Sequence, residues 1–235
     1  ATGNWPGWRG DGGGISPEKN LPLKWSEAEE VKWKVPIPGA GHSSPIVWGD
    51  RVFVTTAVPD DPNVETFRGG VYLGGDRRKP DESEYTYRVI CLDVDLGNIL
   101  WSKAVARQRP KTRRHTKNTY ASETPVTDGT HVFASFGSAG LYCLDFEGNV
   151  IWRRDLGLLR GRQDWGTGAS PILFQDTVIV TGDSSDESYI AAFAKATGES
   201  IWRTERKEGP SWGTPLLFEA DGLMTVVTNA TRRMR

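Results

Sequence analysis

Few side chains in this sequence stand at a spacing that catalytic or metal chemistry requires. The histidines His42, His115 and His131 are scattered, and the cysteines Cys91 and Cys143 belong to no Cys-x-x-Cys pair. No His-Glu-x-x-His motif and no Gly-x-Ser-x-Gly elbow occurs either. Zinc sites and covalently attached haem need such ligand clusters, and elbow-type hydrolases need such a nucleophile. The sequence therefore disfavours zinc, covalent haem and hydrolase chemistry.

One acidic turn could hold a hard cation. Asp183, Asp186 and Glu187 lie close together in the sequence, and Ca²⁺ prefers several oxygen ligands. The turn lacks the Asp-x-Asp-x-Asp-Gly order of an EF-hand loop. An acidic turn without a metal is therefore the favoured interpretation, and the sequence leaves the identity of any metal ligand unknown.

The densest basic run covers residues 107–117 and reads Arg-Gln-Arg-Pro-Lys-Thr-Arg-Arg-His-Thr-Lys. Such a run could bind phosphates, nucleic acid or an acidic protein surface. The aromatic residues that are interleaved with basic ones in single-strand binders are missing, which disfavours nucleic acid. We expect either a solvated loop balanced by acidic residues of the segment 57–86 or a protein-docking surface. The basic side chains assigned to partner binding are Arg77, Arg78, Arg113, Arg114 and Lys117.

A repeated element must position these side chains. The segments 89–101, 141–152 and 190–202 share one pattern: a β-branched or aromatic run, a glycine and then a tryptophan. Glycine suits a turn with positive φ, and the flanking runs suit half-buried strands. A Ser-Pro or Thr-Pro pair precedes each pattern and marks a strand start, because proline has no N–H to donate. These prolines are Pro45, Pro125, Pro171 and Pro215. Four strands per repeat predict an all-β fold, a β-propeller.

The repeats resemble the tryptophan docking motif of the pyrroloquinoline-quinone-type (PQQ-like) propeller family, Ala-x-Asp-x-x-Thr-Gly-x-x-x-Trp. Leu96 replaces the threonine in the first copy, the second copy is one residue short, and Ala194 replaces the aspartate in the third. The resemblance covers nearly all of residues 33–228 and extends to both the quinoprotein dehydrogenases and a non-enzymatic outer-membrane assembly lipoprotein. It implies structural docking roles for four tryptophans, the last three of them largely buried: Trp33, Trp101, Trp152 and Trp202.

The expected organisation is an N-terminal arm followed by one propeller domain. Residues 1–32 form the arm, which we expect to wrap a blade, and residues 33–39 match the outer strand that closes the last blade in this family. About four four-stranded blades are present, as an incomplete arc of a seven- or eight-bladed ring. Their ranges are about 43–106, 121–157, 168–206 and 211–235, the last incomplete. We expect the remaining half of the propeller, or a second copy, to close the ring, and we expect no well-behaved monomer.

Composition and spacing narrow the function classes further. The net charge of −1 argues against a generally nucleic-acid-binding or membrane-adsorbing surface. No run of about 18 apolar residues occurs, so no membrane span is expected. Cys91 and Cys143 take the same place in consecutive blades, too far apart for a disulfide, and should be free and buried.

The insertions 57–86 and 105–120 are expected on one face of the propeller, and loops on a rigid scaffold often bind partners. The resemblance favours a periplasmic or otherwise extracytoplasmic, non-catalytic protein-binding scaffold without a cofactor. The alternative is a PQQ-dependent oxidoreductase of alcohols or sugars, with further ligands outside this sequence. Under that alternative, PQQ with Ca²⁺ would lie at the mouth of the central channel, beside His42, Glu123, Trp165 and Trp212.

Overall fold

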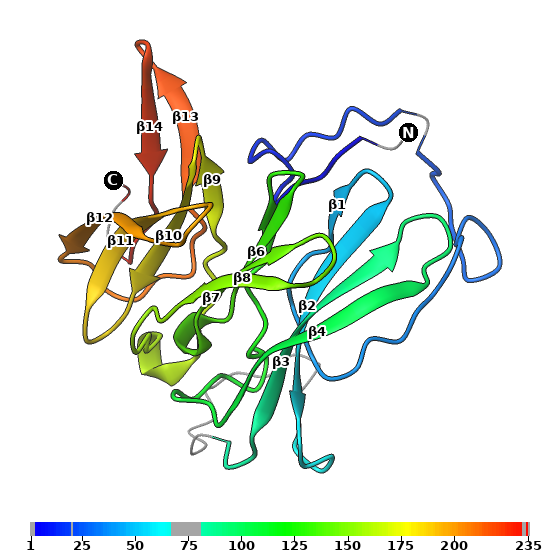
Figure 1. The fold of residues 1–235 in the computed structure, drawn as a ribbon, viewed down its shortest axis with the longest axis horizontal. Helices are drawn as coiled ribbons and strands as arrows, with labels where there is room; N and C mark the ends of the chain where they lie inside the picture. The colour runs from blue at the N-terminus through cyan, green and yellow to red at the C-terminus, as the bar shows by residue number, and fades with distance from the viewer. Residues whose placement is uncertain (1–2, 20, 67–80, 232–233, 235) are drawn as a thin grey trace.

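The protein is built from antiparallel strands that follow one another in chain order (Figure 1). The computed structural model describes residues 3–19, 21–66, 81–231 and 234. The first sheet contains β1 (Ile46–Trp48), β2 (Arg51–Pro59), β3 (Tyr85–Asp93) and β4 (Ile99–Gln108). The second contains β5 (Val126–Thr127), β6 (His131–Ser135), β7 (Leu141–Asp145) and β8 (Val150–Arg154). The third contains β9 (Ile172–Phe174), β10 (Thr177–Asp183), β11 (Ser188–Ala194) and β12 (Ser200–Arg206).

A two-stranded hairpin and two short 3₁₀ turns complete the secondary structure of the described residues. The hairpin pairs β13 (Leu216–Ala220) with β14 (Leu223–Val227). The turns are η1 (Gly137–Ala139) and η2 (Arg162–Asp164). Each four-stranded sheet is an up-and-down meander, which is the topology of a propeller blade. The predicted all-β propeller arc is confirmed: three blades are complete, the fourth contributes two strands, and the described sheets do not close into a ring.

The same cross-strand register recurs in all three four-stranded sheets. A residue of the second strand pairs with a small residue of the third, which pairs with the tryptophan of the fourth, and the register shifts at the following residue. The triplets are Phe53–Cys91–Trp101, Phe133–Cys143–Trp152 and Ile179–Ala192–Trp202. Both cysteines are free and buried, as predicted. Burial raises the pKa of the Cys91 thiol to about 11 and that of Cys143 to about 12.

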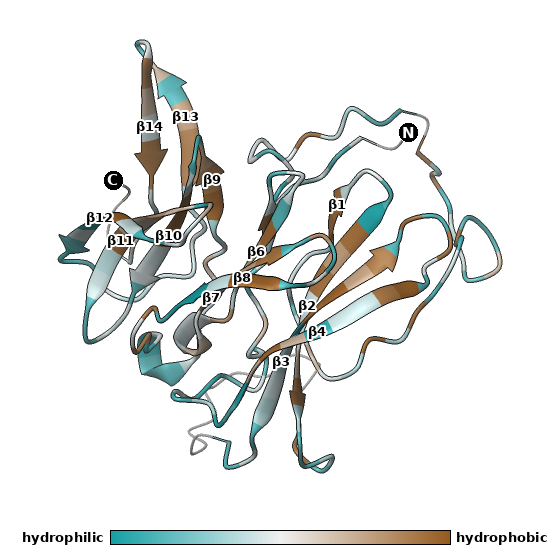
Figure 2. Ribbon diagram, viewed as in Figure 1, coloured by the Kyte–Doolittle hydropathy of each residue, from teal (hydrophilic) through white to brown (hydrophobic). Residues whose placement is uncertain are grey.

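The hydrophobic core lies between the blades. One cluster joins Phe53 and Val89 of the first blade to Val132 and Leu144 of the second. A second cluster joins the second blade to the third. Figure 2 shows the apolar residues concentrated on the strands and the polar ones on many of the connections. Because each core needs two blades, every blade depends on its neighbours for stability.

Consecutive blades are also joined by a tryptophan that reaches the blade that follows it. The indole N–H donates to a backbone carbonyl, and the ring packs on a glycine with positive φ. The hydrogen bonds are Trp33 to Val94 (3.0 Å), Trp101 to Phe146 (2.8 Å) and Trp152 to Lys195 (2.7 Å). A Cβ atom on Gly97, Gly148 or Gly198 would lie within 3 Å of the ring. Glycine is thus required at these turns for its backbone angle and for the close approach of the indole.

Trp202 lacks this contact. Its side chain is 38% exposed, whereas Trp152 is 7% exposed. The prediction that all three later tryptophans are largely buried is therefore wrong for Trp202. The reason is that the β13–β14 hairpin brings no third-to-fourth-strand turn to cover the indole.

A second set of contacts joins the inner strands of the blades. The N–H of Ser44 donates to Thr124 Oγ1 (2.9 Å), that of Thr124 to Ser170 Oγ (3.0 Å), and that of Ser170 to Thr214 Oγ1 (3.0 Å). Each of these residues precedes the proline that opens an inner strand. Three of these pairs therefore have two functions: the proline starts the strand, and the hydroxyl of Thr124, Ser170 or Thr214 accepts a backbone N–H of the preceding blade.

The first part of the N-terminal arm lies along the inner strands, and Lys32 at its end forms an ion pair with Asp95 in the β3–β4 turn (3.0 Å), so the arm contacts the first blade at both ends. Trp5 pairs with Val47 of β1 through two hydrogen bonds of 2.8 and 2.9 Å, and the Pro6 carbonyl accepts the N–H of Thr127 at 2.8 Å. The inner strands have a free edge that can accept such pairing, and this explains the arm's position.

Residues 33–39 form no strand in the described part of the chain. Val35 and Ile37 instead pack on Val52, Ile90 and Leu92 of the first blade. An extended segment becomes a strand only when a neighbour exchanges backbone hydrogen bonds with it. Here β2 contacts the segment through a side chain, since the Thr56 hydroxyl donates to the Pro38 carbonyl (2.6 Å), and backbone pairing with β2 begins only at Ala40, which pairs with Ala57.

Candidate functional site

The long connections gather on one side of the blades, here called the loop face: residues 60–66, 81–84, 109–125, 155–171 and 207–215. In Figure 1 the β4–β5 connection, the end of β2 and the start of β3 lie together at the bottom of the view. Asn118 ties two of these connections together. Its amide donates to the carbonyls of Trp165 (2.8 Å) and Thr167 (3.1 Å), and its Oδ1 accepts from Thr119 N–H (2.8 Å) and the Ser122 hydroxyl.

Arg114 is the buried anchor of the same connection. Its side chain is 6% exposed and forms an ion pair with Asp81 at 3.2 Å. It donates to the carbonyls of Glu65 (2.7 Å) and Asn118 (3.0 Å) and lies over the Tyr120 ring. Because these contacts consume the guanidinium, the assignment of Arg114 to partner binding does not fit its burial: the side chain presents no free surface.

The other basic residues of the run are mostly paired. Arg113 forms an ion pair with Asp164 at 2.9 Å. Lys117 is half-buried, and its backbone N–H donates to His115 Nδ1 (3.0 Å). Arg107 pairs with Asp60 and Glu84, and Lys111 with Asp155. Arg77 and Arg78 lie outside the described residues. Acidic residues of the insertion 57–86 thus pair with Arg107 and Arg114, and acidic residues of the β8–β9 connection pair with Lys111 and Arg113.

Two tryptophans assigned to the channel mouth form an aromatic shelf on the loop face. Trp165 and Trp212 stack with ring centroids 6.2 Å apart and planes inclined by 23°. Trp212 Nε1–H donates to the Gly166 carbonyl at 2.8 Å, and His115 meets the Trp165 ring edge-on at 5.4 Å. Trp212 is still 38% exposed. It borders an open pocket of about 340 Å³ lined by Arg162, Ser211, Asn229 and Thr231.

Glu123 is buried, unlike the partly exposed tryptophan shelf. It is 2% exposed and faces a cavity of about 10 Å³, shared with Thr181 and Asp183. That volume suits roughly one water molecule. Burial raises the pKa of the Glu123 carboxyl to about 7, although hydrogen bonds from Thr167 and nearby backbone N–H groups oppose the shift. At neutral pH this carboxyl is therefore poised between its two protonation states.

The four residues assigned to a PQQ and Ca²⁺ site do not converge on one space. Trp165 and Trp212 lie together, Glu123 faces its own small cavity, and His42 is exposed, with desolvation and Arg114 lowering the pKa of its imidazole. Ca²⁺ takes six to eight oxygen ligands, and the cavity beside Glu123 has no room for such a shell. In this conformation the described residues do not fit PQQ with Ca²⁺.

The acidic turn after β10 is neutralised by arginines. The ion pairs are Asp183–Arg206 (3.2 Å), Asp186–Arg160 (3.5 Å) and Glu187–Arg203 (2.5 Å). Asp183 and Arg206 are buried, and burial raises the pKa of Asp183 to about 6 despite the nearby guanidinium. Within the described ranges, no group of three or more His, Cys, Asp or Glu side chains could hold a metal ion.

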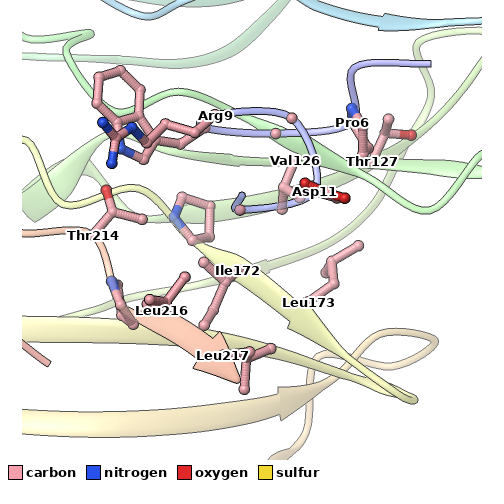
Figure 3. Close-up of a pocket in the computed structure, with 16 residues that line it drawn as sticks. Pro6, Arg9, Asp11, Val126, Thr127, Ile172, Leu173, Thr214, Leu216 and Leu217 are labelled. Carbon is pink, nitrogen blue, oxygen red and sulfur yellow. The ribbon is translucent and has the colours of Figure 1, made fainter. Parts of the chain in front are cut away.

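A second pocket lies under the N-terminal arm (Figure 3). It has a volume of about 260 Å³ and lies between arm residues 6–12 and the inner strands β5, β9 and β13. Sequence reasoning missed it, because only the fold brings the arm onto strands from three different repeats. Its residues carry no motif that could have indicated a pocket.

Comparison with known proteins decides the family. Residues 86–215 match the family described as outer membrane protein assembly factor BamB. The chain belongs to this PQQ-like repeat family. The four-stranded blades and the repeated tryptophan contacts agree with this membership. Among the described residues, no helix is long and apolar enough to cross a membrane.

The relatives of this PQQ-like chain include enzymes and an assembly factor. Polyvinylalcohol dehydrogenase of Sphingopyxis sp. (strain 113P3) is 25% identical over 220 residues, covering 76% of this chain and 34% of the relative. A quinohemoprotein alcohol dehydrogenase (ADHIIG) from Pseudomonas putida HK5 superimposes with a TM-score of 0.51 and 16% identity over 86% of this chain and 26% of that chain. BamB from Moraxella catarrhalis gives a TM-score of 0.40 and 20% identity over 64% of this chain and 41% of that chain. The chain spans about a third of the curated relative's length, and the solved structures show the fold alone.

Proposed function

We propose that this PQQ-like propeller is a non-catalytic, protein-binding scaffold of an extracytoplasmic compartment, with the loop face as its binding surface. The observation that carries the proposal is that hydrogen bonds and ion pairs hold the connections of this face to one another. Asn118 joins the connections that follow the first and second blades, and ion pairs such as Arg113–Asp164 and Lys111–Asp155 join the same two connections. A surface fixed in advance loses less conformational entropy when it binds a partner.

The exposed residues of the loop face are of the kind that dominates protein interfaces. Trp212 is held on one side by Trp165 and exposed on the other, and Arg162 is exposed beside it. Tryptophan and arginine are enriched among the residues that contribute most to binding energy. The extracytoplasmic location rests on membership in a family described by an outer-membrane assembly factor.

Capture of partners by the full-length protein tests the proposal with a matched pair of charge reversals. Arg162→Glu changes the loop face, and Arg153→Glu changes an exposed arginine on the outer strand β8. We expect the first variant to bind the captured partner about tenfold more weakly and the second to bind like the parent protein. Equal binding by parent and Arg162→Glu, or equal losses in both variants, would show that the loop face is not the binding surface.

The alternative function is a quinoprotein oxidoreductase. Two observations favour it: the stacked Trp165–Trp212 shelf and the 25% sequence identity to a polyvinylalcohol dehydrogenase over 220 residues. The test adds PQQ and Ca²⁺ to the full-length protein and measures quenching of tryptophan fluorescence and dye reduction by alcohols. Saturable quenching that Trp212→Phe weakens, together with alcohol-dependent dye reduction, would replace the scaffold proposal with the enzymatic one.

A further inference from the structure

The N-terminal arm forms the roof of the pocket in Figure 3. Trp5 and Pro6 fix it to β1 and β5, and the chain then folds back through tight turns. The Gly10 N–H donates to the Gly7 carbonyl (3.0 Å), and the N–H groups of Gly12 and Gly14 donate to the Arg9 carbonyl (3.2 and 2.8 Å). A Cβ on Gly10 would lie 2.9 Å from the Trp5 ring. Only glycine allows this turn, so the roof is a formed structure rather than a loose tail.

The floor of the pocket is apolar and comes from three blades. Val126 of β5, Ile172 and Leu173 of β9, and Leu216 and Leu217 of β13 line it. These strands are the inner edges of their sheets, so their side chains have no further strand beside them. A ligand that covers this floor gains binding free energy in proportion to the apolar area that it removes from water. The floor therefore favours a ligand with an aliphatic part.

One end of the pocket carries a cation and a hydroxyl donor. Arg9 has a φ of 60°, a left-handed conformation that costs energy in a residue other than glycine and is often found at binding sites. Its guanidinium is exposed and has no ion-pair partner in the part of the chain that the structure describes. Thr214 lies on the same side of the pocket in Figure 3. Thr214 Oγ1 accepts the Ser170 N–H, which leaves its hydroxyl proton to be donated.

The other end carries a negative charge. Asp11 lies away from Arg9 in Figure 3, and its Oδ1 accepts the N–H of Gly13 at 2.9 Å. This carboxylate repels an anionic group from its end of the pocket. A ligand with one carboxylate and an aliphatic chain therefore has a single favourable direction.

We propose that this pocket binds a small aliphatic monocarboxylate. Its carboxylate lies against the Arg9 guanidinium and the Thr214 hydroxyl, and its chain covers Ile172, Leu216 and Leu217. Arginine binds carboxylates through two parallel hydrogen bonds, which are stronger than those to neutral groups. The volume of about 260 Å³ is near the lower limit for ligand pockets and restricts the ligand to a short chain. This site is separate from the loop face and does not depend on the proposed scaffold function.

Titration calorimetry with octanoate, and with 1-octanol as the uncharged probe, tests the proposal on the full-length protein. Arg9→Gln removes the cation, and Arg153→Gln is its control, an exposed arginine of β8 outside this pocket. Leu216→Ser removes apolar surface from the floor of the pocket. Its control is Leu223→Ser, an exposed leucine of the same hairpin that does not line the pocket. Circular dichroism of each variant checks that the fold is retained.

We expect octanoate to bind the parent protein and both controls equally. Arg9→Gln should weaken octanoate binding about tenfold, the loss typical of a charge-assisted hydrogen bond, and should leave octanol binding unchanged. Leu216→Ser should weaken both probes. The proposal is overturned if octanoate does not bind the parent, if octanol binds as tightly as octanoate, or if the controls lose as much affinity as Arg9→Gln and Leu216→Ser.

Discussion

The outer-strand tryptophans lie in different surroundings, and these surroundings determine how much each tryptophan contributes to the stability of the fold. Trp152 is 7% exposed, packs on Gly198 and donates to the Lys195 carbonyl, whereas Trp202 is 38% exposed. We predict that Trp152→Ala lowers the free energy of unfolding by about 3–5 kcal/mol, as for a core aromatic. Trp202→Ala should cost clearly less. Urea denaturation of both variants measures this, and equal losses would contradict the role given to the contact between blades.

Glu123 gives a prediction for the pH dependence of stability. Its pKa is raised to about 7 in the folded protein because the carboxyl is buried, while the unfolded chain has an ordinary value. The folded state thus holds a proton that the unfolded state has lost, so stability decreases as the pH rises from about 4.5 to 7. Replacing Glu123 with Gln should remove this decrease, which amounts to about 3 kcal/mol. Urea denaturation at pH 5 and pH 8 measures it, and identical pH profiles for both proteins would refute the assignment.

Residue types that act locally could be predicted from the sequence, and residues whose role depends on distant partners could not. Free, buried Cys91 and Cys143 followed from their repeated position. The burial of Arg114 did not, because it depends on Asp81 and on the Glu65 carbonyl in another insertion. The buried pair of Asp183 with Arg206 was hidden for the same reason.

At the scale of elements, the third-to-fourth-strand turn of one blade and the tryptophan of the previous blade form a unit. Gly198 has a φ of 67°, and a Cβ there would lie 2.5 Å from the Trp152 ring. Gly222 has a φ of 75° in the β13–β14 turn and would meet nothing within 4 Å. We predict that Gly222→Ala costs only the backbone term of about 1–2 kcal/mol. Gly198→Ala should cost more and should change the Trp152 fluorescence, and equal denaturation midpoints would show that the close approach does not matter.

The strands themselves followed from turn glycines, prolines and alternating apolar residues, since these signals act within a few residues. The segment 33–39 carries the same strand signal through Trp33, yet it forms no strand, because pairing needs a neighbour that its own sequence does not supply. The position of the arm was equally out of reach. Its pairing with Val47 and Thr127 depends on the free inner edges of two sheets.

At the scale of the whole molecule, the blades form an arc whose two candidate surfaces have different character. The loop face is polar, with paired charges and a tryptophan shelf. The pocket under the arm is apolar, with a charge at each end. The repeat predicted the arc, because each blade is specified by its own segment. Neither surface could be predicted in full, because each brings together residues from three or more repeats.

The scaffold proposal is tested most directly by site-specific photo-crosslinking in the organism that makes the protein. A photoreactive residue replaces Arg162 on the loop face in one variant, and Glu147 in the exposed turn between β7 and β8, on the opposite face, in the other. The account predicts that the position-162 variant yields a discrete protein adduct and that the position-147 variant yields none. Adducts from position 147 alone, or the same adducts from both positions, would contradict the claim that partners bind the loop face.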